Sequence, residues 1–262
     1  MLQTELIGLL EELLRTGGNH DKLALVKIEE KFLNFLGRKE NVMGCSDDIN
    51  IVLAKDAIRL IDASCIYATT TDRIEASKSM QPFFDRILEM EWKDWNYYDL
   101  LMLVCSINYT ETDEQAVALA HKTTLPFIKF KEVENIGVVD GGLSCNLCSR
   151  LVYAEFFDEA ADFNLISEEF YISYNRLIRL AEDHSSLALP LLVTKIREAV
   201  LKQRREEQFT LLDELKANYD ENIYSAISSE VSFYRVAERY DSRLHKDIFG
   251  FNEDIKVVSK VL

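Results

Sequence analysis

The chain has 262 residues, of which 48% are hydrophobic and 29% are charged, and its formal net charge at pH 7 is -15. This apolar content supports a sizeable core and excludes wholesale disorder. The acidic balance disfavours binding to phosphate backbones or anionic lipid headgroups, because like charges repel. We therefore expect no membrane partner and no direct contact of this chain alone with nucleic acid.

The sequence also predicts a cytoplasmic location. The opening stretch MLQTELIGLLEELLR has no basic leader region and carries glutamates within its apolar pattern, unlike a signal peptide. No apolar run reaches the roughly 20 residues that a membrane-spanning helix needs. The 5 cysteines, at positions 45, 65, 105, 145 and 148, are odd in number and scattered, which is typical of reduced thiols.

The first three predicted elements are helices. Glycine and proline are scarce, at 9 and 3 residues, and this favours long helices. Leucines between positions 2 and 14 recur at spacings of three and four residues, which predicts a helix. This predicted helix ends at the glycine pair 17–18. A second helix is predicted over 22–36 and ends at Gly37. A third follows the N-cap cluster Ser46-Asp47-Asp48.

Capping patterns and aromatic residues mark the next helices. The pairs Asp72–Glu75 and Thr112–Gln115 have capping-box spacing, which predicts the starts of a fourth and a sixth helix. Pro82 predicts a kink or a break within the fourth helix. The stretch EMEWKDWNYYDLLML, residues 89–103, begins the fifth helix and contains both tryptophans of the chain.

The remainder of the chain continues the helical pattern. Helices are predicted at about 142–163, 167–183, 188–219, 222–246 and 250–262. The run KQRREEQ at 202–208 indicates a helix junction or a solvated face. No convincing strand is found: short apolar runs such as residues 136–139 could be extended, but they are isolated. The pattern predicts an all-α, tetratricopeptide-like α-solenoid of antiparallel helix pairs, with about ten or eleven helices. We interpret residues 1–262 as a single helical-repeat domain with a possible joint near 131–142.

No motif in the sequence identifies a catalytic centre. Cys145-Asn-Leu-Cys148 lacks the two further ligands of a zinc site and the preceding strand of a thioredoxin-like motif, so buried structural thiols are the favoured interpretation. The glycine pair 141–142 is interpreted as a turn before a helix rather than as a phosphate cradle. We assign no catalytic residue, no metal ligand and no cofactor. An enzyme with distant carboxylates is a minority hypothesis.

Polar residues in the second half of the chain are candidates for ligand contacts. If helices near 95–107, 142–150 and 172–198 line a groove, buried arginines there would bind a peptide backbone or a carboxylate. On a convex face the same residues would be ordinary solubilising charges. The candidates are Asn146, Asn175, Arg176, Arg179 and Arg197.

The aromatic stretch at 89–103 has a structural interpretation and also a family resemblance. Large aromatic side chains fill the wedge at a tight helix–helix corner, so we assign Trp92, Trp95, Tyr97 and Tyr98 to a structural aromatic corner. The segment EMEWKDWNYYDLLMLVCSI resembles a stretch of the Rgg/MutR transcriptional regulators, where a helix ends in tryptophan and a Tyr-Tyr-Glu-type sequence begins the next helix. The matching positions are Trp95, Tyr97, Tyr98 and Asp99.

The resemblance covers residues 5–130 and returns near 205–219 and 250–258. It implies a regulatory sensor domain of the kind used in quorum sensing, which forms a homodimer and binds a short, mostly apolar signalling peptide in a concave helical groove. The family's helix-turn-helix domain does not precede the match, so DNA would be reached only through a missing domain or a partner protein. Cys105 stands where the family often has asparagine, so we transfer no specific peptide contact.

Two alternatives stay open at the level of sequence. The chain is either such a sensor or a non-catalytic α-helical scaffold for protein–protein interaction. A C-terminal amphipathic surface with Phe249, Phe251, Ile255 and Val258 is either intramolecular core or the contact of a homodimer.

Overall fold

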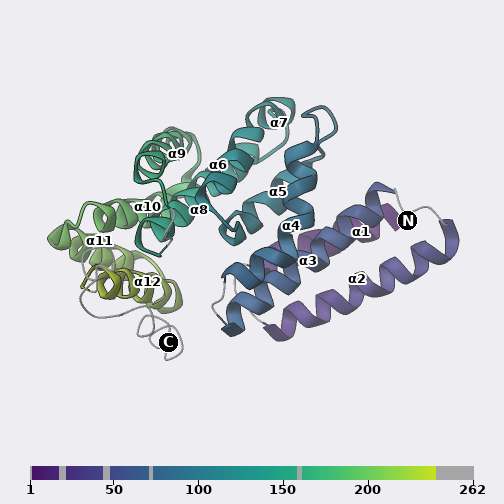
Figure 1. Ribbon diagram of the computed structural model, residues 1–262, viewed down its shortest axis with the longest axis horizontal. Helices are drawn as coiled ribbons and strands as arrows, with labels where there is room; N and C mark the ends of the chain where they lie inside the picture. The colour runs from purple at the N-terminus through teal and green to yellow at the C-terminus, as the bar shows by residue number, and fades with distance from the viewer. Residues whose placement is uncertain (1, 18–21, 44–47, 71–72, 158–160, 240–262) are drawn as a thin grey trace. The chain divides into compact units, whose positions relative to one another are not determined.

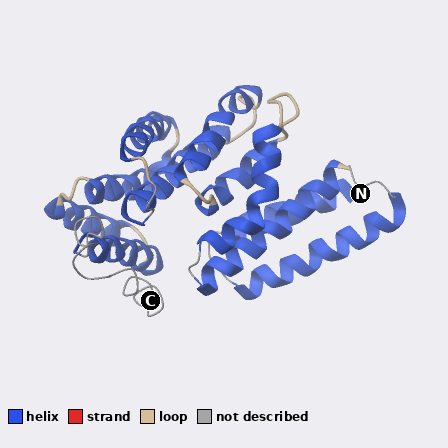
Figure 2. Ribbon diagram, viewed as in Figure 1, coloured by secondary structure: helices blue, strands red, loops and turns tan. Residues whose placement is uncertain are grey.

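The computed structural model describes residues 2–17, 22–43, 48–70, 73–157 and 161–239 (Figure 1). These residues form twelve α-helices and two short 3-10 helices, and no strand occurs among them (Figure 2). The predicted all-α class is therefore confirmed. The chain divides into two compact units, residues 1–139 and 140–262, and the boundary lies within the segment that the sequence marks as a possible joint.

The first unit is built from consecutive helices that pack side by side. Its elements are α1 (Leu2–Gly17), α2 (Lys22–Met43), α3 (Ile49–Thr70), α4 (Arg73–Glu89), α5 (Tyr97–Ser106), η1 (Ile107–Tyr109), α6 (Asp113–Lys122) and α7 (Thr124–Lys129). Helix α3 contacts α1, α2, α4 and α5, and α1 also contacts α5. A strict array of repeats needs only nearest-neighbour contacts, so the solenoid arrangement stays a prediction.

Several predicted helix boundaries in this unit are corrected by packing. Helix α2 continues past Gly37 to Met43, so the predicted end at Gly37 is wrong. A helical glycine costs only about 1 kcal/mol, which burial of side chains such as Phe32 and Phe35 outweighs. Helix α4 runs through Pro82 without a break. Ser46, Asp47, Thr71 and Asp72 lie outside the described residues, but the Asp48 carboxylate does accept a hydrogen bond from the backbone N–H of Asn50, at 2.8 Å.

The aromatic corner is a turn between α4 and α5. A reciprocal capping box starts α5: the Asn96 side chain accepts from the backbone N–H of Asp99, and the Asp99 carboxylate accepts from the backbone N–H of Asn96. The fifth helix therefore begins at Tyr97 and not at residue 89. Trp95 is 1% exposed and Trp92 is 41% exposed, so the two tryptophans have different roles.

Further contacts hold this corner in place. Lys129 of α7 donates hydrogen bonds to the backbone carbonyls of Lys93 and Trp95, both at 2.6 Å. Tyr97 and Tyr98 meet edge to face with ring centroids 5.9 Å apart. The turn is thus fastened to α7 by polar contacts while Trp95 fills the space beneath it.

A buried charge cluster joins α3, α4 and α5. The Arg86 guanidinium donates to the carboxylates of Asp56, at 2.7 Å, and of Asp99, at 2.8 Å, and both carboxylates are almost fully buried. Arg59 donates to Asp56 as well, at 2.6 Å. Burial raises the pKa of Asp56, while Arg86 and Arg59 lower it. Burial lowers the pKa of Arg86, but the two aspartates outweigh this and raise it.

The second unit also consists of helices. Its elements are α8 (Ile136–Phe157), which enters the unit at Asp140, α9 (Phe163–Asp183), η2 (Ser185–Leu187), α10 (Ala188–Leu201), α11 (Arg205–Asn218) and α12 (Glu221–Arg239). Helix α10 contacts α9, α11 and α12. Buried side chains cover most of the circumference of α8, and its remaining face, which carries Asn146, Ser149, Tyr153 and Phe156, is half-buried.

The structure corrects three predictions in this region. Residues 136–139 are helical rather than extended, and the glycine pair 141–142 lies inside α8 rather than in a turn before it. The predicted helix 188–219 is two helices, separated at residues 202–204, where Gln203 has a φ of 54°. Of the two interpretations of 202–208, a helix junction or a solvated face, this break at 202–204 confirms the junction. The predicted helix 250–262 lies outside the described residues.

Gly141 is needed for close packing inside the second unit. A Cβ at this position would lie 2.5 Å from Cδ1 of Leu187, a side chain that is itself 1% exposed. We expect Gly141→Ala to lower the free energy of unfolding by about 1–3 kcal/mol, because the core must shift to accept the methyl group. Chemical denaturation measures the change.

The matched control is Gly8→Ala in α1, where nothing lies within 4 Å of the added Cβ. This change should raise the free energy of unfolding by about 0.5–1 kcal/mol through helix propensity alone. Equal effects of the two substitutions would contradict the packing that we describe for Gly141.

Candidate functional site

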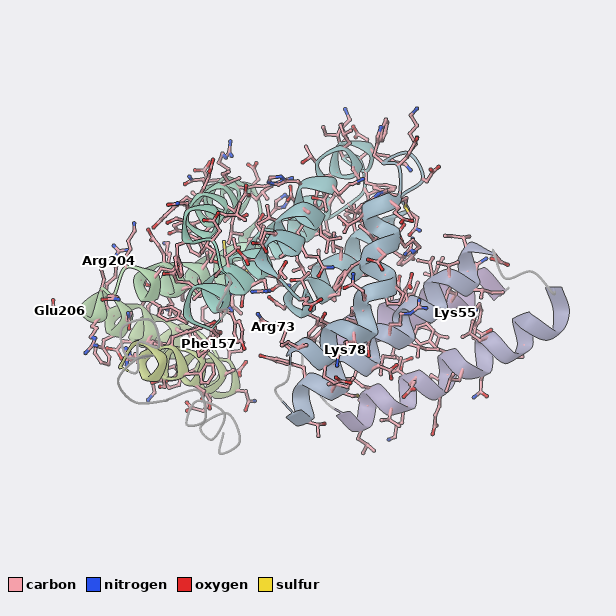
Figure 3. The ribbon with its side chains drawn as sticks, in the orientation of Figure 1. Lys55, Arg73, Lys78, Phe157, Arg204 and Glu206 are labelled. Atoms are coloured by element: carbon pink, nitrogen blue, oxygen red, sulfur yellow. The ribbon has the colours of Figure 1, made fainter. Side chains whose placement is uncertain are left out.

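Among the described residues, the most concentrated group of aromatic side chains lies between α8 and α12 in the second unit. We call it the aromatic surface, and its members are Tyr153, Phe156, Phe157, Phe233 and Tyr234. The rings of Phe157 and Phe233 stack with centroids 4.5 Å apart, and Phe156 lies 5.2 Å from Tyr234. Tyr234 is only 3% exposed, whereas the other four rings are half-buried. Tyr234 therefore forms the floor, and the other rings are partly accessible (Phe157 is labelled in Figure 3).

An ion pair lies next to this aromatic surface. Arg197 of α10 donates from Nε to Oε1 of Glu230 on α12, at 2.9 Å, and from a terminal nitrogen to Oε2, at 3.1 Å. This is the two-pronged geometry in which arginine binds carboxylates most strongly. Glu230 precedes Phe233 and Tyr234 by three and four residues, so all three side chains share one face of α12.

The environment keeps Arg197 charged. Burial lowers the pKa of Arg197, but Glu230 and then Cys145 outweigh it and raise the pKa above the ordinary arginine value. The Cys145 Sγ also accepts a long hydrogen bond from Arg197, at 3.6 Å. Because Glu230 neutralises the guanidinium, the pair adds polarity beside the rings but little net charge.

Helix α8 extends the aromatic surface with polar residues. Asn146, Ser149, Tyr153 and Phe156 follow one another at spacings of three and four residues, so they form one stripe along the helix. All four are half-buried. The stripe therefore runs from amide and hydroxyl groups at one end to aromatic rings at the other, which suits a ligand with polar backbone groups and apolar side chains.

The polar residues that the sequence identified do not converge on one point. Arg176 pairs with Asp140 through two hydrogen bonds, at 3.0 and 2.7 Å, near the start of α8, about 24 Å along the helix from Phe156. Burial raises the pKa of Asp140 and Arg176 lowers it. Asn175 and Arg179 are exposed on α9, where Arg179 donates to the backbone carbonyl of Asn175. Only Asn146 and Arg197 lie on helix faces close to the aromatic surface.

The two cysteines of the C-x-x-C pattern are core residues, as the sequence predicted. Cys145 lies 3.7 Å from the carbonyl oxygen of Pro190, and Cys148 lies 3.7 Å from that of Phe170. Burial raises the pKa of Cys148 well above the ordinary thiol value, so this side chain stays protonated. Within the described ranges, no group of three or more histidine, cysteine, aspartate or glutamate side chains is arranged to hold a metal ion.

Sequence reasoning missed the aromatic surface and the ion pair beside it. The sequence YAEFF at 153–157 and the pair Phe233-Tyr234 are dense in aromatic residues, which is a visible signal. Their convergence is not visible, because about 80 residues separate the two segments and only the packing of α8 on α12 joins them.

Comparison of this chain with protein-family models, with curated proteins and with solved structures found no match in any of the three. None of the helices in the described part of the chain combines the length and apolar composition needed to cross a membrane.

Proposed function

We propose that this chain is a non-catalytic regulatory sensor that binds a short, mostly apolar peptide on the aromatic surface of its second unit. The observation that carries this proposal is the group of half-buried rings beside an ion pair that is already neutral: Phe156, Phe157 and Phe233 pack around Tyr234, and Tyr153 packs on Phe157. Aromatic rings provide large apolar contact areas with little conformational entropy to lose. The resemblance of the segment 89–107 to the Rgg/MutR regulators supports the same class of function.

The charges of the site favour an apolar ligand over an anionic one. Asp140 already neutralises Arg176, and Glu230 neutralises Arg197. A ligand carboxylate would have to displace a protein carboxylate from either arginine, which costs much of what the new contact contributes. Apolar side chains that cover the rings would need no such exchange.

Regulation would follow from a difference in affinity between two conformations. A peptide shifts a protein toward the state that it binds more tightly, and only by the difference in binding free energy. Helices α8, α10 and α12 are joined here by the Arg197–Glu230 pair and by the rings, so a peptide on this surface would contact the elements whose packing defines the state. A DNA-binding domain or partner protein would then transmit the change.

The proposal predicts saturable binding of short apolar peptides. We expect a fluorescently labelled library of such peptides to contain binders with micromolar dissociation constants, measured by fluorescence anisotropy. The double substitution Phe157→Ala and Phe233→Ala should weaken the best binder about tenfold or more, which corresponds to about 1.4 kcal/mol or more of lost binding free energy.

The control is Phe209→Ala, which removes a ring of the same unit that is 55% exposed and lies outside the aromatic surface. It should leave peptide binding unchanged, and circular dichroism should show intact helices in both variants. If no peptide in the library binds saturably, or if both variants bind like the original protein, the proposal is wrong.

An α-helical scaffold for protein–protein contact is the second candidate. Several apolar side chains are exposed on the described surface of the first unit, including Trp92, at 41%, and Ile128 of α7, at 60%. Trp92 and Ile128 belong to one region, because their chain neighbours are in contact: Lys129 donates a hydrogen bond to the backbone carbonyl of Lys93. Exposed tryptophan is enriched among the residues that dominate protein–protein binding. Failure of the peptide screen would favour this candidate.

A further inference from the structure

Helix α2 has a second face whose apolar side chains are exposed to solvent. Its inner face carries Leu25, Ile28, Phe32 and Phe35, each no more than 2% exposed. Its outer face carries Leu23, Val26 and Leu33, which are 68%, 37% and 52% exposed. Single exposed apolar residues are ordinary, but three on one helix face form a candidate interaction surface.

Two opposite charges accompany these apolar residues. Lys27 and Glu30 are both exposed, and together with Leu23, Val26 and Leu33 they lie within about 120° around the helix axis. Within the described residues neither Lys27 nor Glu30 has an ion-pair partner. Other charges of α2 are used inside the unit: Lys31 pairs with Glu12 of α1 at 2.6 Å, and Arg38 pairs with Glu5. The outer face therefore has its own unused pair of charges.

We propose that this outer face of α2 is a contact between two copies of the chain, packed antiparallel about a two-fold axis. In such a contact, residues equally far on either side of the axis face each other, and every contact occurs twice. An axis at the level of Glu29 places Leu33 opposite Val26 of the second copy, and Lys27 opposite Glu30 of the second copy, each to within about one residue. The face is therefore complementary to itself, because apolar side chains meet apolar side chains and each lysine meets a glutamate.

This inference deepens the proposed function, because the family resemblance that supports the sensor implies a homodimer but does not locate its contact. The C-terminal surface with Phe249 and Phe251 lies outside the described residues, whereas α2 offers a defined face. Three apolar side chains from each copy and two ion pairs make a small contact compared with the roughly 1,600 Å² that stable complexes bury. We therefore expect a dimer that dissociates on dilution into the micromolar range.

Sedimentation velocity of the full chain over a concentration series tests the contact. We expect a shift from the 30.2 kDa monomer toward twice that mass as the concentration rises. Replacement of Val26 and Leu33 by glutamate should leave only monomer. Lys27→Glu alone, or Glu30→Lys alone, should weaken self-association about tenfold or more, because like charges then face each other.

The combination Lys27→Glu with Glu30→Lys is the decisive variant. Each ion pair across the contact would re-form with reversed polarity, so the dimer should return. The matched control is Ile172→Glu on α9, which places the same charge at an apolar side chain that is 51% exposed but lies on the second unit. Circular dichroism must show the original helicity for every variant.

Three outcomes overturn the proposal: a monomer at every concentration, a dimer that resists the changes at Val26 and Leu33, and a charge reversal that does not restore association. Anisotropy with the apolar peptides, measured on the original chain and on the Val26 and Leu33 variant, separates this inference from the proposed function. If the variant keeps the mass of the dimer and peptides still bind, the α2 contact is wrong and the sensor stands. If the variant is a monomer but no peptide binds to either protein, the contact stands and the sensor is wrong.

Discussion

Replacement of Arg86 by alanine should lower the free energy of unfolding by about 3–5 kcal/mol, because it leaves two buried carboxylates without their shared cation. Arg86 donates to both Asp56 and Asp99, which are 1% and 0% exposed, and its own side chain is 21% exposed. Arg59 would still reach Asp56, but among the described residues the Asp99 carboxylate would keep only the hydrogen bond from the backbone N–H of Asn96. Urea denaturation at pH 7 measures the loss.

The control is Lys78→Ala on the same helix. Lys78 pairs with Glu75 at 2.6 Å, but the two side chains are 67% and 52% exposed (Lys78 is labelled in Figure 3). Solvent screens such a pair, so the change should alter stability by no more than about 1 kcal/mol. Similar effects of the two substitutions would show that burial of the α3–α4–α5 charge cluster is not what makes Arg86 important.

The loss caused by Arg86→Ala should also depend on pH. Burial raises the pKa of Asp56 in the folded protein, and Arg86 is the largest influence that lowers it. A carboxyl group whose folded pKa exceeds its unfolded value binds its proton more tightly when folded, so its contribution to stability improves as pH falls through that raised pKa. Without Arg86 the pKa of Asp56 rises further. The deficit of the variant should therefore be smaller at pH 5 than at pH 7.

Replacement of Trp95 by alanine should cost about 3–5 kcal/mol of folding stability, because it empties the space under the turn between α4 and α5. Trp95 is 1% exposed, and its indole N–H has no acceptor among the described residues. The side chain therefore stabilises the corner by filling volume rather than by hydrogen bonding. Trp95→Phe should accordingly lose less than half of the stability that Trp95→Ala loses.

Trp92→Ala is the matched control, since it removes the same side chain three residues earlier at a position that is 41% exposed. We expect this change to alter stability by less than about 1 kcal/mol. Tryptophan fluorescence provides a second readout, because the variant that keeps only Trp95 should emit at shorter wavelength than the variant that keeps only Trp92. Equal stability losses would contradict the different burial of the two residues.

Local patterns in the sequence were enough to predict the helical class and most helix positions. Apolar residues at spacings of three and four, few glycines and clear capping residues are local signals, and local signals decide helix formation over a few turns. Thr112, for example, accepts from the backbone N–H of Gln115 at the start of α6, as its pattern predicts. The buried C-x-x-C cysteines and the junction at 202–208 were predictable for the same reason.

Contacts between distant parts of the chain, in contrast, depend on how the helices pack. Gly37 and Gly141 both resemble helix ends in sequence, yet packing of their neighbours carries α2 and α8 through them. Arg176 and Arg197 resemble ligand contacts, but each has a carboxylate partner at least 33 residues away in the chain. The aromatic surface unites segments separated by most of the second unit. Such contacts depend on how helices pack, and helical periodicity shows which face of a helix is apolar but not which partner covers it.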